Sequence, residues 1–544
     1  MNRRKFLLNS SLGSVSLSGL GLSLSSCQPQ AVESELTAQD TDTFAPDFEL
    51  DEITIAELQK GMEDGTYTAE AITQLYLERI VAIDKNGPSL KAVIELNPEA
   101  LEIAQRLDEE RANGNVRGSL HGIPIMLKDN IDTGDRMQTT AGALAMEGHQ
   151  AEEDAFIVKQ LREAGAIILA KTNLSEWANF RSTRSSSGWS SRGGQTKNPY
   201  ATNRNPCGSS SGSGVAVSAN LCALAIGTET NGSIVCPAST NGIVGIKPTL
   251  GLLSRAGIIP IAHTQDTAGP MARTVTDAVV MLGTITAVDE KDSATQTESR
   301  KALTDYTPYL NENGLEGKRI GIWRGAMGFH EEVDALMEAA FERMRQQGAT
   351  LVDVEKVQAD EPLGNAGFQV LLYEFKADLN QYLQEHPNAP VKSLEEVIAF
   401  NKANEASAMP YFKQEILERA QEKGDLNTEE YKDALAKIKR VNGKEGIDLR
   451  MQEHDLDAII APTGGPAWPT DLITGDHFLG GSSSPAAQAG YPNITVPAGF
   501  VHGLPVGISI FGKAWTEPEL ISIAYAYEQA SKNRKKPKFL THIV

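Results

Sequence analysis

Two loops of small residues, Cys207–Gly214 and Gly227–Ser233, contain the residues of this sequence that are best suited to chemistry. Glycine-rich turns let the backbone approach a ligand closely, and their successive N–H groups can surround an anion. The second loop ends in Ser233, whose hydroxyl becomes a nucleophile once a base removes its proton. We therefore interpret the N–H groups from Thr230 to Ser233 as candidate donors to a developing oxyanion.

A flexible Gly/Ser linker is the alternative interpretation of these two loops. The segment that joins them argues against a linker, because it is apolar, carries little charge and includes Val215, Leu221 and Ile226. Residues of these types are expected in the protein interior. The sequence therefore favours two loops held around a buried element.

Lys128 is the candidate base, at the end of the short apolar run Ile123–Leu127. Both faces of this run are apolar, which predicts a strand buried in a sheet, and open α/β sheets bind ligands at strand ends. Burial disfavours the ammonium form, so it lowers a lysine pKa from about 10.4 toward neutrality, as a base requires. From the strand alone, a lysine that simply reaches solvent remains the alternative.

Other catalytic patterns are incomplete in this sequence. None of the nine histidines lies in the two loops, and His330–Asp334 begins like a zinc helix but lacks the second histidine. Gly208–Gly212 fits the G-x-S-x-G nucleophile elbow, but that motif needs a preceding strand, and Asn198–Pro206 is polar and contains prolines. We predict no metal site and no cofactor.

These motifs resemble the signature of the amidase signature family, in which an upstream lysine, a bridging serine and a serine nucleophile form a triad. The lysine motif of the family is matched at Gly122, Ile123, Pro124, Lys128 and Asp129. The resemblance implies that Lys128 is the base, Ser209 the bridging serine and Ser233 the nucleophile. It also implies a cis peptide bond before the bridging serine and an oxyanion hole at Thr230, Asn231 and Gly232.

This sequence departs from the family signature at three positions. Cys207, Ser211 and Asn231 stand where glycine is usual. Asparagine tolerates positive φ better than most residues, so we expect the loop geometry around Asn231 to survive the replacement.

The resemblance extends from about residue 48 onward, and residues 173–180, 188–200 and 265–273 resemble the peptide amidase branch of the family. It implies hydrolysis of a primary carboxamide to carboxylate and ammonia through an acyl-enzyme, with the C-terminal amide of peptides as the expected substrate. The alternatives are an amidase for other small, aromatic or fatty acyl amides, the tRNA-linked amidotransferase subunit of the family, and a catalytically inactive envelope lipoprotein.

The rest of the chain must build the sheet that positions these residues. Apolar runs alternate with amphipathic segments from a capping box at Thr54–Glu57 onward, which predicts the α/β class. The family resemblance implies a large central mixed β-sheet covered by helices on both faces. We expect one amidase domain over residues 48–544, with a charged, largely helical segment at about 368–450 near the substrate entrance.

Residues 1–27 have the features of an export signal. Arg3–Lys5 precede an apolar stretch diluted by serine and glycine, which resembles a twin-arginine signal, and Leu24–Cys27 resembles a lipoprotein cleavage box. We expect lipidation of Cys27 and a polar flexible linker over residues 28–47. This predicts a protein on the periplasmic side of the cell envelope whose only membrane contact is its lipid anchor.

Charge and cysteine content limit the partners and the chemistry further. The net charge of −21 opposes contact with phosphate backbones, so the expected partner is a small-molecule or peptide amide and not nucleic acid. The sequence leaves the oligomeric state open. We expect Cys207, Cys222 and Cys236 to be buried free thiols, since so few cysteines do not form a disulfide scaffold.

Overall fold

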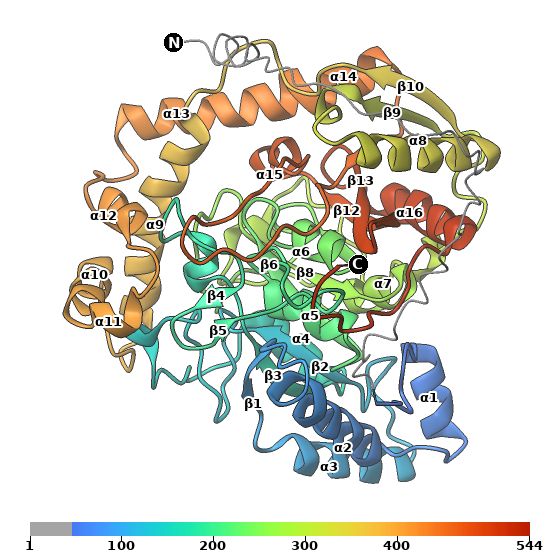
Figure 1. The fold of residues 1–544 in the computed structure, drawn as a ribbon, viewed down its shortest axis with the longest axis vertical. Coiled ribbons are helices and arrows are strands. Elements are labelled where there is room, and N and C mark those ends of the chain that lie inside the picture. The colour runs from blue at the N-terminus through green and yellow to red at the C-terminus, as the bar shows by residue number, and fades with distance from the viewer. Residues whose placement is uncertain (1–45, 544) are drawn as a thin grey trace, which may run out of the picture. The chain divides into compact units, whose positions relative to one another are not determined.

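The computed structural model of the protein describes residues 46–543 (Figure 1). The predicted signal over residues 1–27, the lipidation site Cys27 and nearly all of the linker 28–47 lie outside the described residues. No helix within residues 46–543 combines the length and the apolar character needed to cross a membrane.

An 11-stranded mixed sheet forms the centre of the fold and is flanked by helices (Figure 1), which confirms the expected α/β class. Its strand order is β1-β3-β2-β6-β8-β7-β12-β13-β11-β9-β10, and β4 and β5 form a separate two-stranded ribbon. The strands are β1 Val93–Leu96, β2 Pro124–Lys128, β3 Ile167–Thr172, β4 Trp189–Ser190, β5 Gly194–Gln195, β6 Leu224–Glu229, β7 Val244–Lys247, β8 Thr267–Ala272, β9 Arg319–Trp323, β10 Thr350–Val354, β11 Ala458–Pro462, β12 Asn493–Val501 and β13 Leu504–Phe511.

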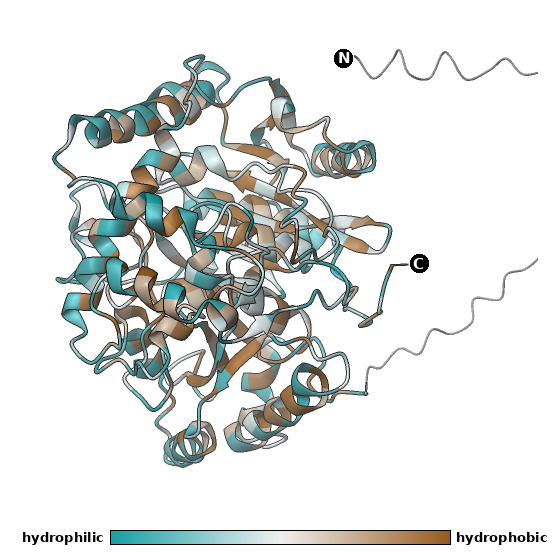
Figure 2. Ribbon diagram, turned by 60° about the vertical axis from the view of Figure 1, so that its left-hand side comes forward, coloured by the Kyte–Doolittle hydropathy of each residue, from teal (hydrophilic) through white to brown (hydrophobic). Residues whose placement is uncertain are grey.

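Strand β2 lies in the interior of the sheet, between β3 and β6, and runs parallel to both. All five of its residues are buried, as are all six residues of β6. Figure 2 shows hydrophobic residues concentrated along the central strands. A lysine at the end of β2 is thereby carried into the protein interior, as the apolar run before it predicts.

The helices connect and cover these strands. Helix α1 begins with the predicted capping box, in which the Thr54 and Glu57 side chains each bond to the backbone of the other. The helices are α1 Ile55–Glu63, α2 Ala69–Arg79, α3 Ala100–Ala112, α4 Phe156–Glu163, α5 Ser211–Ser218, α6 Val235–Thr240, α7 Val275–Thr284, α8 Glu331–Gln346, α9 Ala366–Glu385, α10 Leu394–Ala403, α11 Glu405–Ala408, α12 Glu415–Gln421, α13 Glu429–Lys439, α14 Asp448–Glu453, α15 Ser484–Ala489 and α16 Glu517–Ser531.

Helices α9 to α13 gather at one side of the molecule (Figure 1), and α9, α10 and α12 contribute to a second hydrophobic cluster. In this cluster Phe375 of α9 packs against Trp177 and Phe180, which follow β3. The contact joins the helical segment to the part of the chain that follows β3. This position lets α9 form one wall of the cavity described below.

Candidate active site

Lys128 ends β2 with its side chain fully buried. Its Nζ lies 2.7 Å from Ser209 Oγ and donates to Thr228 Oγ1 at 2.8 Å and to the Thr228 carbonyl at 3.2 Å. Burial lowers the pKa of Lys128 to about 7, although the carboxylates of Asp266 and Glu229 partly oppose this shift. A neutral amine can therefore form at this site near neutral pH and accept the proton of Ser209.

Ser209 is held at the start of the first loop by the residues beside it. The Gly208–Ser209 peptide bond is cis, as the family resemblance implies. The next residue, Ser210, accepts a hydrogen bond from Thr228 N at 3.1 Å and donates to its carbonyl at 3.0 Å. A Cβ on Gly227 would lie 2.7 Å from Ser210 Oγ, so glycine is required there for this close approach.

Ser233 is the last residue of the second loop, just before α6, and it is 8% exposed. Its carbonyl accepts a hydrogen bond from Ser210 N at 3.1 Å, which joins the two loops next to both serines. Within residues 46–543 no side-chain hydrogen bond links Ser209 to Ser233. The structure thus brings Lys128 and Ser209 into direct contact and places Ser233 beside them through the backbone.

The oxyanion loop differs from the prediction in two respects. Positive φ occurs at Gly232, at +82°, and not at Asn231, so the replacement of glycine by Asn231 costs no strained conformation. The Gly232 N–H is already paired, at 2.8 Å, with Glu229 Oε1. Among the described residues the N–H groups of Thr230, Asn231 and Ser233 have no protein acceptor, so these three are the donors available to an oxyanion.

Sequence reasoning missed the role of Glu229, although an acidic residue at this position is part of the family signature. Its buried carboxylate accepts from Gly232 N through Oε1, and from Ile234 N at 2.8 Å and Val235 N at 3.1 Å through Oε2. Unpaired N–H groups at the start of a helix need such acceptors. Glu229 therefore fixes the backbone on both sides of Ser233.

We expect Glu229→Gln to lower kcat about 10- to 100-fold with little change in KM. The side-chain amide of the variant places an N–H group opposite backbone N–H groups that need an acceptor, so the loop loses hydrogen bonds that hold it in place. We therefore expect the unfolding free energy to fall by about 1–3 kcal/mol. Steady-state kinetics and urea unfolding measure the two effects. The matched control is Glu517→Gln, which changes a buried carboxylate bonded to Thr249 N, and it should cost stability without lowering kcat. An equal kcat loss in both variants would contradict a local role for Glu229.

A cavity of about 970 Å³ adjoins the second loop. Thr228, the hydrogen-bond partner of Lys128, and Thr230 line it on the side of the sheet, whereas Asp378, Tyr382 and His386 line it on the side of α9 and its C-terminal end. Acidic side chains outnumber lysine and arginine in its lining. The cavity is therefore an electronegative space that reaches the loop of the predicted nucleophile.

The expectation of three free thiols is wrong for two of the cysteines. Cys207 and Cys236 form a disulfide, with 6.0 Å between their Cα atoms, while Cys222 is a buried free thiol. Cys207 is the first residue of the first loop and Cys236 follows Ser233, so the packing of the two loops brings the thiols together. The disulfide cross-links the two segments that carry Ser209 and Ser233.

Comparison with known proteins agrees with this geometry. A probable amidase of Arabidopsis thaliana is 42% identical over 502 residues, covering 91% of this chain and 93% of that protein. The X-ray structure of native peptide amidase from Stenotrophomonas maltophilia matches with a TM-score of 0.87 and 50% identity, covering 90% of this chain and 99% of that one. A glutamyl-tRNA(Gln) amidotransferase subunit from Thermoanaerobacter pseudethanolicus is 32% identical over 508 residues, covering 90% of this chain and 99% of that protein.

A family model described as amidase matches residues 71–521, which is most of the chain. The match includes both catalytic loops and the end of β2, and it agrees with the resemblance of their motifs to the family signature. The chain therefore belongs to the amidase signature family and is a hydrolase that acts on amide C–N bonds.

Proposed function

We propose that this amidase removes the C-terminal amide of peptides, giving the free carboxylate and ammonia, with Lys128, Ser209 and Ser233 as its catalytic triad. The observation that carries the chemistry is the buried contact of 2.7 Å between Lys128 Nζ and Ser209 Oγ beside the loop of Ser233. The likeness to peptide amidase from Stenotrophomonas maltophilia supports the choice of substrate.

The first half of the reaction forms an acyl-enzyme. Neutral Lys128 takes the proton of Ser209 while Ser209 takes the proton of Ser233, and Ser233 Oγ bonds to the carbonyl carbon of the amide. The carbonyl oxygen becomes an oxyanion held by the free N–H groups of Thr230, Asn231 and Ser233. The proton then returns through Ser209 to the leaving nitrogen, the C–N bond breaks, and ammonia departs.

The second half releases the product. Water attacks the ester of Ser233 and gives one proton to Lys128 through Ser209, and this proton returns to Ser233 Oγ as the carboxylic acid leaves and ionises to the carboxylate. The acidic lining of the cavity repels the negative product but not the neutral amide. The electrostatics of the cavity thus favour uncharged C-terminal amides over the acids formed from them.

The substrate proposal is tested by ammonia release from three classes of amide at equal concentration. We expect kcat/KM to be highest for an N-acetylated dipeptide amide, lower for benzamide and lowest for a long-chain fatty acid amide. A higher kcat/KM on benzamide or on the fatty amide would replace peptide amides by that class. The Ser233→Ala variant serves as the blank, since ammonia from it would come from a contaminant.

The tRNA-linked reaction named for one relative has no support in the charge of this chain. A net charge of −21 opposes the approach of a polyanionic tRNA. The amidase reaction on peptides needs no such partner.

We also propose that the protein is exported and anchored in the cell envelope through lipid on Cys27. The disulfide between Cys207 and Cys236 supports this location, because such bonds persist in oxidising compartments and are rare in the cytosol. Cells that express the full chain are labelled with a palmitate analogue, and the label should be lost in Cys27→Ser. Equal labelling of both chains, or of neither, would contradict the anchor.

A further inference from the structure

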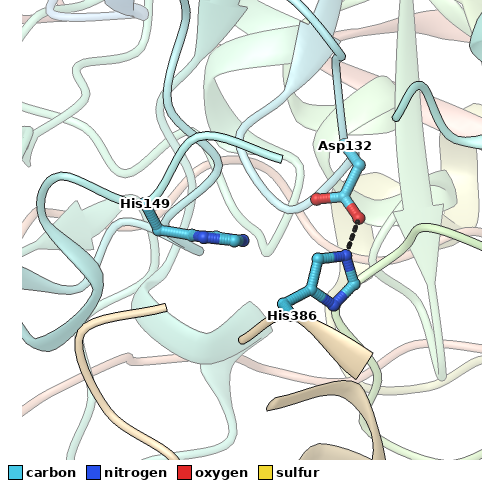
Figure 3. Close-up of side chains that lie close together, drawn as sticks. All are labelled: Asp132, His149 and His386. Carbon is cyan, nitrogen blue, oxygen red and sulfur yellow. Dashed lines mark ion pairs between the residues drawn. The ribbon is translucent and has the colours of Figure 1, made fainter. Parts of the chain in front are cut away.

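We propose that Asp132, His149 and His386 form a binding site for one divalent transition-metal ion, such as Zn²⁺, on the wall of the cavity. One ligand atom from each residue lies within 4.8 Å of the others. Figure 3 shows the two imidazoles and the carboxylate turned toward one another. All three residues line the cavity, which gives an ion a path of entry.

The three residues come from distant parts of the chain. Asp132 follows β2, His149 follows the short helix Leu144–Met146, and His386 ends α9. No short motif spans them, which is why the sequence alone predicts no metal site. The fold alone brings the three side chains together.

Two polar atoms of this cluster are buried without a hydrogen-bond partner among the described residues. They are Asp132 Oδ2 and His149 Nδ1, and both residues are 1% exposed. Asp132 Oδ2 lies 3.1 Å from His386 Nε2 and forms an ion pair with it when His386 is protonated (Figure 3). Buried polar atoms are rarely left unpaired, so His149 Nδ1, which has no polar partner among the described residues, points to a partner that the protein itself does not supply.

The surrounding contacts hold the cluster in a form suited to metal binding. His386 Nδ1 donates to the Tyr382 carbonyl at 2.7 Å, which directs the lone pair of Nε2 away from the backbone when the imidazole is neutral. The hydroxyl of Tyr382 donates to Asp132 Oδ1 at 2.7 Å, which leaves Oδ2 available. Histidines that bind metal commonly donate their other ring N–H to a carbonyl in this way, and carboxylate ligands are also held by outer hydrogen bonds.

Two imidazoles and one carboxylate match the ligand set of zinc sites that keep a fourth position open. Zinc bonds of about 2.0–2.1 Å in a tetrahedron place ligand atoms about 3.3 Å apart, close to the 3.1 Å between Asp132 Oδ2 and His386 Nε2. Magnesium and calcium prefer all-oxygen sites, so this cluster should not bind them tightly. A bound ion would link α9 to the segment after β2.

A second cluster provides a matched comparison. The ligand atoms of His263, Glu374 and Asp378 also lie within 4.8 Å of one another, and Glu374 and Asp378 come from α9. Their carboxylates are already occupied, since Asp378 Oδ2 accepts from His263 N at 3.0 Å and Glu374 Oε2 accepts from Thr264 N at 3.0 Å. This second cluster has its acceptors satisfied by the protein, so we propose no ion there.

Calorimetric titration of the chelator-treated full chain with Zn²⁺ tests the proposal. We expect one ion per chain and a Tm that rises with Zn²⁺, because binding to the native state alone stabilises it. His149→Gln and His386→Gln should each weaken Zn²⁺ binding by more than about 100-fold, since loss of even an outer-shell partner costs 10- to 100-fold. The control His263→Gln should bind Zn²⁺ like the original protein.

The Tm of each variant without metal verifies that it is folded, so a lost binding signal can be assigned to the site. Cobalt(II) is a second probe, whose visible absorption reports tetrahedral ligation and should vanish in both cluster variants. Absence of Zn²⁺ binding by the original protein would overturn the proposal in favour of a plain hydrogen-bonded contact between α9 and the core. Unchanged binding in His149→Gln and His386→Gln, or its loss only in His263→Gln, would overturn it equally. The test uses no amidase assay, so it is independent of the proposed function.

Discussion

Ser233→Ala is expected to lower kcat on the order of 10⁶-fold, as removal of the nucleophile does in other serine hydrolases. The reason is that the second loop has only two other hydroxyls, and both are already hydrogen-bonded. The Thr228 hydroxyl accepts from Lys128, and the Thr230 hydroxyl donates to Asp266, so neither can replace Ser233 as the nucleophile. Ammonia release from a peptide amide measures the loss. Substrate binding should persist, because the variant keeps the cavity and the loop backbone.

The matched control is Ser211→Ala in the first loop. Ser211 Oγ donates to the Cys207 carbonyl and touches neither Lys128 nor Ser233, and the family has glycine at this position. This variant should keep most of its kcat. A fluorophosphonate probe should label the original protein and Ser211→Ala but not Ser233→Ala. Turnover or labelling that survives in pure Ser233→Ala would require a different nucleophile.

Local sequence motifs predicted those features of the site that depend on residues adjacent in the sequence. The apolar run before Lys128 predicted a buried strand, and β2 ends at this lysine with every residue buried. The apolar segment between the two loops predicted a buried element, and every residue of α5 and β6, which lie there, is buried. In both cases the pattern that made the prediction consists of residues close in sequence to a predicted catalytic residue, and local patterns of this kind predict secondary structure and burial well.

The parts that sequence did not predict depend on pairs of residues that only the fold brings together. The disulfide of Cys207 with Cys236 depends on the packing of two loops against each other. The sequence alone does not show this packing, so it predicted buried free thiols for both cysteines. Glu229 could be recognised as part of the signature, but not its three backbone contacts across the turn that carries Ser233. The same holds for Asp132, His149 and His386, which no periodicity relates.

Replacing Lys128 by methionine is expected to lower kcat/KM by about 10²- to 10⁴-fold, the range that a general base contributes. In the original protein kcat/KM should rise with pH through about 7, because the buried amine must lose its proton to act. The variant should lose this step in the pH profile together with the rate. A pH profile that keeps its inflection near 7 in Lys128→Met would assign the titration to another group.

The same substitution should also raise the stability of the protein. An unfolded lysine has a pKa of about 10.4, and burial lowers that of Lys128 to about 7, so the unfolded chain binds more protons between these values. This difference costs about 4 kcal/mol of unfolding free energy at pH 7, and the cost shrinks as pH rises toward 10. Lost hydrogen bonds to Ser209 and Thr228, worth about 0.5–1.5 kcal/mol each, offset part of the gain, so we expect Lys128→Met to be about 1–3 kcal/mol more stable at pH 7.

Urea unfolding at pH 7 and at pH 9.5 measures the gain and its decline. Lys247 is the matched control, because burial lowers its pKa to about 8 and its Nζ donates to the carbonyls of Pro248 and Tyr491, neither of which belongs to the proposed triad. Lys247→Met should show a similar pH dependence of stability but retain kcat/KM. Only a lysine that is kept uncharged at a cost to the fold, and whose removal also ends the reaction, has the properties of a base maintained for catalysis. A Lys128→Met variant that loses activity without any gain in stability would indicate that Lys128 is charged in the native protein and acts as an electrostatic group.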